Sequence, residues 1–351
     1  MSRKKILVIS YGGTIVMVVD EKSKSVKPAS NIKEVISIFP NLEDLANIEI
    51  KVLSNKDSTN VTPEDWTKLA KFIYEQHDNY DGFVITHGTN TMAYTASALA
   101  LALGRGLKKP VILTGSQLPL TVFGNDARFN FEHAVATCVA AAEKHIAEVL
   151  IVFNDKVLRG SRSVKISESS FRAFESPAFH QLGTITANGV SFSPDVHIVE
   201  EAAPFRLQPN FDGSIFSIDL TPGQRPELIE NLVKSGQCDG LILKSHGAGS
   251  VPTEGRYSFL PLIKMATSQY KIPVVVSTKF LGGNVCKIIN DEPAVLAVKY
   301  GAIPSGDITD VMTEVKLMWL MAQGLSSIEE VGYAMLHSYV GEVSSMGKQQ
   351  V

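Results

Sequence analysis

Cysteine is scarce in this sequence, and neither sign of charge dominates. The chain of 351 residues has three cysteines, Cys138, Cys238 and Cys286, which lie far apart and form no CxxC motif. An odd number of cysteines without paired spacing fits a reducing compartment and argues against a disulfide framework. The formal net charge is −3 and the positive residues are scattered, so we expect no binding to nucleic acid, which requires a basic patch or stripe.

Long hydrophobic runs are also missing. The apolar segment 6–9 is too short for the core of a signal peptide, and no stretch approaches the roughly 20 apolar residues that cross a membrane. Hydrophobic residues make up 44% and charged residues 20% of the chain, which is typical of a globular protein. We therefore expect a soluble, cytoplasmic protein that does not bind a membrane and that is long enough for two domains.

Short apolar segments alternate with helical patterns in the first part of the chain. The segments interpreted as strands are 6–9, 82–85, 111–113 and 149–153. They are largely apolar and uninterrupted, as expected of parallel strands whose two faces are both covered. The segments interpreted as helices begin at Thr62-Pro63 or cover 91–104 and 126–143. This alternation predicts a doubly wound α/β domain with a mostly parallel sheet.

The alternation is lost between about residues 191 and 213, where several prolines and the Asp212-Gly213 turn punctuate the chain. A second α/β pattern follows it. Its expected strands lie at 241–243, 274–276 and 302–303, and its expected helices at 227–233 and 311–321. We therefore predict a larger N-terminal catalytic domain over residues 1–190, a linker over 191–213 and a smaller C-terminal α/β domain over 214–351.

Glycine and hydroxyl-bearing residues follow the expected strands of the first domain. Ligands of doubly wound sheets bind beyond the carboxyl ends of the strands, so the residues directly after each strand matter most. Two glycines, Gly12 and Gly13, allow a tight turn and a close approach of the backbone to a ligand. The pattern GxGxxG is not present, which argues against dinucleotide binding. We interpret His87 as a structural histidine and expect no metal, because no second ligand candidate has suitable spacing.

Five strings, in this order, resemble those of the bacterial-type L-asparaginases. They are Gly12-Gly13-Thr14-Ile15, Asp57-Ser58, Thr86-His87-Gly88-Thr89 with Thr91-Met92 after one residue, Leu113-Thr114-Gly115-Ser116, and the downstream Lys165. The similarity covers essentially the whole chain, and the segments 93–99 and 306–309 look like those of the cytoplasmic type I branch.

The resemblance implies a chemistry and a set of roles. In that family a threonine hydroxyl attacks the side-chain amide of asparagine, ammonia leaves, and water hydrolyses the acyl-enzyme ester to aspartate. By match, Thr14 is the nucleophile, Thr89 the second hydroxyl and Lys165 the supporting base. A threonine hydroxyl is a weak nucleophile that needs an adjacent base, and a lysine can serve once its pKa is lowered. The implied substrate-binding residues are Asp57, Ser58, Gly88, Asn90 and Ser116.

The resemblance also implies that no metal or organic cofactor is needed and that the protein forms a homodimer or homotetramer. The family's second, activating asparagine site is altered in this sequence. Val164, Lys244 and Phe280 stand there in place of Thr, Arg and Cys, so allosteric activation is not expected.

Two positions near the expected site depart from the family pattern. Asn90 stands where the family has an Asp that binds the substrate ammonium, which predicts weaker recognition of free asparagine because a charged hydrogen bond is lost. The segment 17–28 lacks the tyrosine that activates the nucleophile in the family. Either Tyr11 replaces that tyrosine or activation differs.

Three other functions remain open from the sequence. An amidohydrolase acting on glutamine, D-asparagine or a substituted amide would fit Asn90, since a substrate without a free ammonium would not need the carboxylate. A non-catalytic amino-acid-binding homologue would fit the two departures, although Thr14, Thr89 and Lys165 are all present. A subunit of a tRNA-linked amidotransferase would carry an extra N-terminal domain, whereas here Gly12-Gly13-Thr14 lies near the start of the chain.

Overall fold

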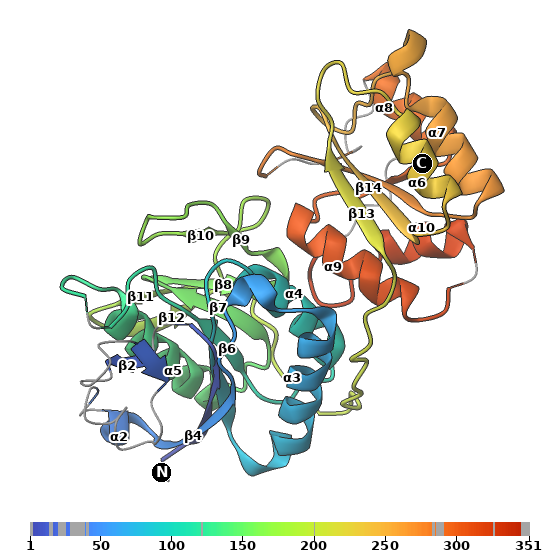
Figure 1. Ribbon diagram of the computed structural model, residues 1–351. Coiled ribbons are helices and arrows are strands. Elements are labelled where there is room, and N and C mark those ends of the chain that lie inside the picture. The colour runs from blue at the N-terminus through green and yellow to red at the C-terminus, as the bar shows by residue number, and fades with distance from the viewer. Residues whose placement is uncertain are drawn as a thin grey trace. The chain divides into compact units, whose positions relative to one another are not determined.

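The chain forms two compact units, Met1–Ser176 with His180–Pro209, and Pro177–Phe179 with Asn210–Val351. They are shown in Figure 1, a computed structural model. The structure describes residues 3–13, 17–19, 26–28, 39, 42–120, 122–199, 201–282, 285, 291–325 and 327–344. Within the described residues, every helix is too short or too polar to span a lipid bilayer.

The first unit is built on an eight-stranded sheet with the order β12-β11-β8-β7-β6-β5-β1-β4. The strands are β1 (Lys5–Tyr11), β4 (Asn47–Ser54), β5 (Gly82–Thr86), β6 (Val111–Thr114), β7 (Val149–Phe153), β8 (Lys156–Arg159), β11 (Gly183–Thr186) and β12 (Gly189–Phe192). The strands from β4 to β7 in the sheet are parallel, and β8, β11 and β12 continue the sheet antiparallel. The predicted doubly wound, mostly parallel sheet is therefore confirmed.

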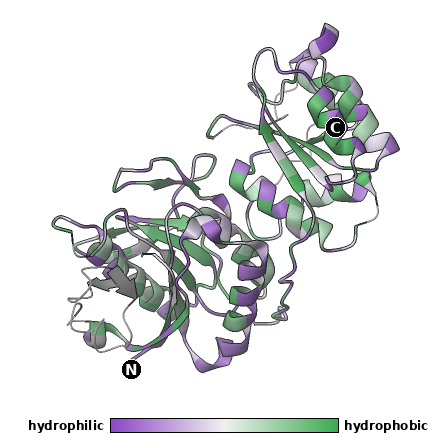
Figure 2. Cartoon of the chain, in the orientation of Figure 1, coloured by the Kyte–Doolittle hydropathy of each residue, from purple (hydrophilic) through white to green (hydrophobic). Residues whose placement is uncertain are grey.

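Helices cover both faces of this sheet. In Figure 1, α5 (Ala127–Glu143) lies on one face, and α3 (Pro63–Gln76) and α4 (Met92–Leu103) lie on the other. Apart from Tyr94, every residue of α4 is buried, which explains its almost continuous apolar sequence. Figure 2 shows that the central strands are hydrophobic, whereas the outer side of α3 is hydrophilic.

Smaller elements complete the first unit. They are the helix α2 (Leu42–Leu45), the antiparallel pairs β2 (Met17–Val19) with β3 (Val26–Pro28) and β9 (Val164–Lys165) with β10 (Phe174–Glu175), and short 3-10 turns at Ser58–Asn60, His77–Asn79 and Gly160–Arg162. The pair β9–β10 forms the base of a hairpin whose loop covers residues 166–173. This hairpin presents Lys165.

The second unit has its own parallel sheet of four strands, β13 (Ile215–Asp219), β14 (Gly240–Ser245), β15 (Val274–Thr278) and β16 (Ile303–Pro304). Its helices are α6 (Glu227–Lys234), α7 (Leu260–Lys264), which continues into a π turn at Met265–Gln269, α8 (Glu292–Lys299), α9 (Asp310–Met321) and α10 (Ile328–Leu336). In Figure 1, α9 and α10 lie on one face of the sheet and α6, α7 and α8 on the other, which confirms the smaller C-terminal α/β fold.

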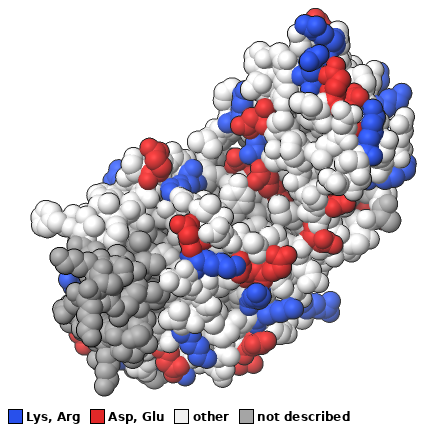
Figure 3. Space-filling model, viewed as in Figure 1, with Lys and Arg blue, Asp and Glu red and all other residues white. Residues whose placement is uncertain are grey.

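The surface carries both signs of charge. On the face shown in Figure 3, lysines and arginines are interspersed with aspartates and glutamates over both units. This face shows the scattered distribution that the sequence predicted.

Candidate active site

Two glycines bring the end of β1 against the loops that follow β4 and β5. Gly12 and Gly13 have φ angles of +94° and +82°, which favour glycine. A Cβ atom on Gly12 would lie 2.2 Å from the carbonyl oxygen of Lys56, and one on Gly13 would lie 2.8 Å from the carbonyl of His87. A side chain at either position would therefore force these loops apart.

The loops after β4, β5 and β6 meet in the same way. A Cβ atom on Gly88 would lie 2.6 Å from the hydroxyl of Ser58, and one on Gly115 would lie 2.5 Å from the carbonyl oxygen of His87. The hydroxyl of Thr91 donates to the carbonyl oxygen of Ser58 at 2.6 Å. The strand ends that carry the predicted Ser58, Gly88 and Ser116 thus lie together at one edge of the sheet.

Asp57 begins the turn that contains Ser58. Its carboxylate accepts a hydrogen bond from the backbone N–H of Thr59 at 2.8 Å. Hydrogen bonds from Thr59 hold the pKa of the Asp57 carboxyl below its usual range, so this exposed group is an anion at neutral pH.

Lys165 reaches from its hairpin to the second hydroxyl position. Its Nζ donates to Thr89 Oγ1 at 2.8 Å and to Asn90 Oδ1 at 3.0 Å. Burial lowers the pKa of Lys165, because the charged ammonium is partly removed from water, and the negative charge of Glu168 opposes this effect. The structure therefore joins three residues, Thr89, Asn90 and Lys165, that the sequence placed in one site.

The predicted nucleophile falls outside the described residues. Thr14 directly follows Gly13 in the sequence, and residues 20–25 of the segment after it are not described either. Residues 17–28 contain no tyrosine, and the effect of this on the activation of Thr14 stays a prediction from the sequence.

Tyr11, the proposed replacement for that tyrosine, forms its side-chain hydrogen bonds with Asp65. Its hydroxyl donates to Asp65 Oδ1 at 3.1 Å and is 3.3 Å from the Asp65 carbonyl oxygen. Burial, reinforced by the Asp65 carboxylate, raises the pKa of Tyr11 well above its usual range. A phenol held neutral by a structural hydrogen bond is a poor proton acceptor, so this geometry disfavours Tyr11 as the activating residue.

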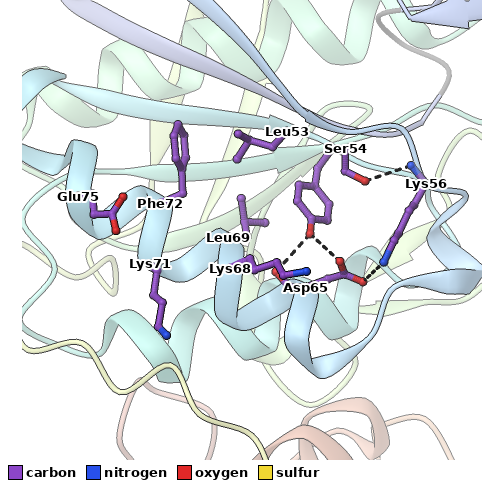
Figure 4. A pocket seen from close by; sticks show the side chains of 10 residues that line it. Leu53, Ser54, Lys56, Asp65, Lys68, Leu69, Lys71, Phe72 and Glu75 are labelled. Atoms are coloured by element: carbon purple, nitrogen blue, oxygen red, sulfur yellow. Dashed lines mark hydrogen bonds and ion pairs between the residues drawn. The ribbon is translucent and has the colours of Figure 1, made fainter.

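Tyr11 and Asp65 border a pocket of about 530 Å³ between β4 and α3. Figure 4 shows its polar end, where Lys56 and Asp65 are joined, and its apolar wall, which includes Leu53 and Phe72. Among the described residues that line this pocket, none belongs to the predicted catalytic or substrate-binding set.

His87 has the structural role that the sequence predicted. Trp66 Nε1 donates to Thr95 Oγ1 at 3.2 Å, the Thr95 hydroxyl lies 3.0 Å from His87 Nε2, and His87 Nδ1 lies 2.7 Å from the Gly88 carbonyl oxygen. Since the carbonyl can only accept, Nδ1 carries the proton and Nε2 accepts from Thr95. Burial lowers the pKa of His87 to about 4, so the ring is neutral at physiological pH.

Two buried polar residues that support the site were missed by the sequence reasoning. The Asp126 carboxylate accepts from the backbone N–H groups of Gln117 at 2.9 Å and Leu118 at 3.0 Å, and Asn130 Nδ2 donates to the Gly115 carbonyl oxygen at 2.9 Å. Both lie in the first turns of the helix pattern over 126–143, where the sequence indicates Asp126 only as the helix start. Their signal is a pair of polar residues, spaced by four, on the buried side of that helix.

In the second unit, Lys244 forms ion pairs with two carboxylates. Its Nζ lies 3.0 Å from Glu314 and 3.6 Å from Asp310. Burial alone would lower the pKa of Lys244, but these carboxylates raise it above its usual value. The Lys244 ammonium is thus paired with two carboxylates of α9, and the absence of allosteric activation stays a prediction.

Comparison with known proteins gives the family. Residues 5–197 match the family model described as Asparaginase, N-terminal, and residues 214–335 match the Glutaminase/Asparaginase C-terminal domain. The chain belongs to the asparaginase family, which confirms the resemblance seen in its motifs.

Similar proteins carry two kinds of name. The L-asparaginase of Thermococcus kodakarensis is 34% identical over 97% of this chain and 99% of its own length, and L-asparaginase 1 of Escherichia coli K12 is 33% identical over 98% and 99%. A glutamyl-tRNA(Gln) amidotransferase subunit from Methanosarcina barkeri is 30% identical over 91% of this chain and 74% of its own length.

Solved structures share the fold over nearly the whole chain. The thermostable L-asparaginase from T. kodakarensis matches with a TM-score of 0.86 and 33% identity, covering 97% of this chain and 99% of that one. The L-asparaginase I of Vibrio cholerae matches with a TM-score of 0.85 and 32% identity, covering 98% and 100%.

Proposed function

We propose that the protein hydrolyses the side-chain amide of L-asparagine to L-aspartate and ammonia through a threonine acyl-enzyme. In this proposal Thr14 is the nucleophile, Thr89 the second hydroxyl and Lys165 the base that supports it. The observation that carries the proposal is the hydrogen bond of 2.8 Å between Lys165 Nζ and Thr89 Oγ1, together with the burial that lowers the pKa of Lys165.

The chemistry follows from that contact. A lysine whose pKa is lowered is more often neutral near physiological pH and can then take a proton from a hydroxyl within hydrogen-bond reach. The negative oxygen that develops on the amide carbon needs fixed donors, and backbone N–H groups near Thr89 and Ser116 are the proposed source. Asp57 and Ser58 are proposed to hold the α-amino and α-carboxylate groups of the amino acid, with Gly88 leaving room for it.

Asn90 supports a second candidate substrate class. Its Oδ1 accepts from Lys165, so the hydrogen bond at this position is kept while the negative charge of an aspartate is absent. A neutral acceptor binds an ammonium more weakly than a carboxylate does. An amide without a free α-ammonium, such as an N-acylated asparagine, would lose less at this position, which favours a related amidohydrolase as the alternative.

Ammonia release separates these possibilities. Purified protein is assayed with L-asparagine, D-asparagine, L-glutamine and N-acylated asparagine. For the preferred substrate we expect Thr14→Ala to abolish turnover and Lys165→Met to lower kcat by at least about 10²-fold, the size of a lost general base. Lys144→Met, an exposed lysine next to the end of α5, is the matched control that should keep full activity.

The outcomes of this assay distinguish the main proposal from its alternatives. Turnover of L-asparagine that depends on both residues supports the main proposal, and a preference for the acylated amide supports the alternative. Full activity in Lys165→Met contradicts the assigned base. No turnover of any of the four amides would indicate a non-catalytic homologue or a subunit of a larger amidotransferase.

The cellular compartment and the oligomeric state are also part of the proposal. We propose a cytoplasmic homodimer or homotetramer acting on a small amino-acid amide. The buried free thiols of Cys138 and Cys238 support a reducing compartment, and the oligomer follows from the family. Light scattering of the purified protein would test the oligomeric state, with a monomer contradicting it.

A further inference from the structure

Asn130 uses its whole side-chain amide to join three segments. It is fully buried on α5, and its Nδ2 donates to the Gly115 carbonyl oxygen at 2.9 Å and to Asp126 Oδ2 at 3.0 Å. Its Oδ1 accepts from the backbone N–H of Asn154 at 2.8 Å. Both N–H donors and the oxygen are therefore satisfied, so the side chain has one preferred orientation.

On one side, this amide fixes the loop that carries Ser116. Asn130 holds the carbonyl before Ser116, and Asp126 holds the N–H groups of the two residues after it, Gln117 and Leu118. Asp126 is itself buried and oriented by Asn130. The backbone of Ser116 is thus held on both sides by α5.

On the other side, the connection continues to the hairpin that carries Lys165. Asn154 directly follows β7 and has a φ of +56°, a left-handed conformation that asparagine tolerates. Its Nδ2 donates to the Phe171 carbonyl oxygen at 3.3 Å, in the loop between β9 and β10. A second connection runs from Gln117 Nε2 to the Ser170 carbonyl oxygen at 3.0 Å.

We infer that Asn130 is a positioning residue for the amidase centre. With Asn154 it forms a polar bridge that sets the spacing between the Ser116 loop and the hairpin of Lys165. The roles of Ser116 and Lys165 in this inference rest on the proposed function. The donors and the base belong to loops far apart in sequence, and a misplacement of about 1 Å at such groups lowers turnover by about 10²-fold. A rigid bridge between the two loops is therefore required for turnover.

Two variants and one control test the bridge. Asn130→Ala removes all three hydrogen bonds. Asn154→Gly keeps the left-handed backbone and its N–H but removes only the bond to Phe171, so it should fold as the wild type does. Thr137→Val is the matched control, because Thr137 is also fully buried on α5 and its hydroxyl has no hydrogen-bond partner among the described residues.

Turnover and the reactivity of Lys165 are measured for each. We expect kcat to fall about 10²-fold in Asn130→Ala and about tenfold in Asn154→Gly, with a smaller change in KM and an unchanged control. Competitive acetylation of Lys165, followed by mass spectrometry across pH, should report a pKa closer to that of a free lysine in both variants. A variant that only destabilised the protein would change Tm and would leave the Lys165 pKa as it was.

The outcomes keep this inference separate from the proposed function. If Asn154→Gly retains the kcat and the Lys165 pKa of the wild type, the bridge is not a positioning element. If the wild type turns over none of the amides, the proposed function fails. The acetylation result then decides alone whether Asn130 and Asn154 position Lys165. An Asn130→Ala protein that does not fold leaves Asn154→Gly as the deciding variant.

Discussion

At the scale of single residues, the charge around Lys165 depends on position 90. The Asn90 amide accepts from the Lys165 ammonium without contributing a negative charge. We predict that Asn90→Asp raises the pKa of Lys165, because the added carboxylate favours the protonated form. It should also lower KM for L-asparagine by about tenfold, since a charged hydrogen bond to the substrate ammonium replaces a neutral one.

Steady-state kinetics across pH test this prediction. The acidic limb of kcat/KM should move to higher pH in Asn90→Asp as its base becomes harder to deprotonate. Asn90→Ser, which also keeps a neutral acceptor, is the control. An Asn90→Asp variant with no better apparent affinity for asparagine would count against the role assigned to this position.

The neutral state of His87 predicts a loss of stability in acid. Burial lowers the pKa of this imidazole from 6.5 to about 4 in the folded chain. Below pH 6.5 the unfolded chain binds a proton that the folded chain does not, so the stabilisation is complete above that pH and decreases as the pH falls toward 4. The loss reaches about 3 kcal/mol for a shift of this size.

Urea unfolding at neutral and acidic pH measures this effect. His87→Gln cannot be protonated but keeps a donor and an acceptor, and it should have the shallower dependence of the unfolding free energy on pH. Equal slopes in the two proteins would show that His87 does not contribute.

At the scale of secondary-structure elements, Asp65 stabilises the start of α3. Its carboxylate accepts from the backbone N–H of Thr62 at 2.9 Å, from Lys56 Nζ at 2.6 Å and from the Tyr11 hydroxyl at 3.1 Å. We predict that Asp65→Asn destabilises the protein by about 2 kcal/mol, a moderate value because the Lys56 side chain is partly exposed. Thermal unfolding checks this, with the exposed Glu64→Gln as the control on the same turn.

The sequence predicted most of the parallel strands of the two sheets and none of the antiparallel strands that extend the first sheet. The four apolar segments of the first domain all became strands, because central parallel strands are buried on both faces. The sequence did not predict β4 and β13, which lie at sheet edges, nor β8, β11 and β12, which continue the first sheet antiparallel. β4 alternates polar and apolar residues, Asn47, Ile48, Glu49 and Ile50, as a half-exposed strand does, and so lacks the uninterrupted apolar run of a strand buried on both faces.

The arrangement of the loops at the candidate site was predictable in part. Gly88, Thr89 and Ser116 follow expected strands, and the topology of a doubly wound sheet alone brings such positions together. Ser58 follows β4, which the sequence did not predict, so its position at this edge comes from the structure. The contacts of Asn130 with Gly115 and Asn154 were not predictable, since they depend on how α5 packs across the loops after β6 and β7. Gly115 and Asn154 lie far from Asn130 in the sequence, and no regular sequence spacing relates the three residues.

At the scale of the whole molecule, each unit has its own core and its own buried polar connections. In the second unit, Lys316 and Glu342 are both fully buried and pair at 2.7 Å. Lys316 Nζ also donates to the carbonyl oxygens of Met335 at 2.8 Å and His337 at 2.6 Å. This ammonium therefore holds the chain after α10 against α9.

We predict that Lys316→Met destabilises the second unit by about 3–5 kcal/mol, because it leaves the Glu342 carboxylate buried without its cation. Hydrogen exchange should increase in α9 and α10 and remain slow in β5 and β6 of the first unit. Replacing Glu342 by Leu as well should restore part of the loss. Uniformly faster exchange in both units would contradict separate cores.

The close contacts of the glycines also determine how this enzyme scaffold can change. Gly12, Gly13, Gly88 and Gly115 each face backbone or side-chain atoms so closely that an added methyl group has no space. In a mutational scan these positions should tolerate no substitution, whereas exposed hairpin positions such as Ile166 and Phe171 should tolerate many. Directed evolution toward a new amide would therefore gain most from varying residue 90 and the hairpin, while the glycine framework stays as it is.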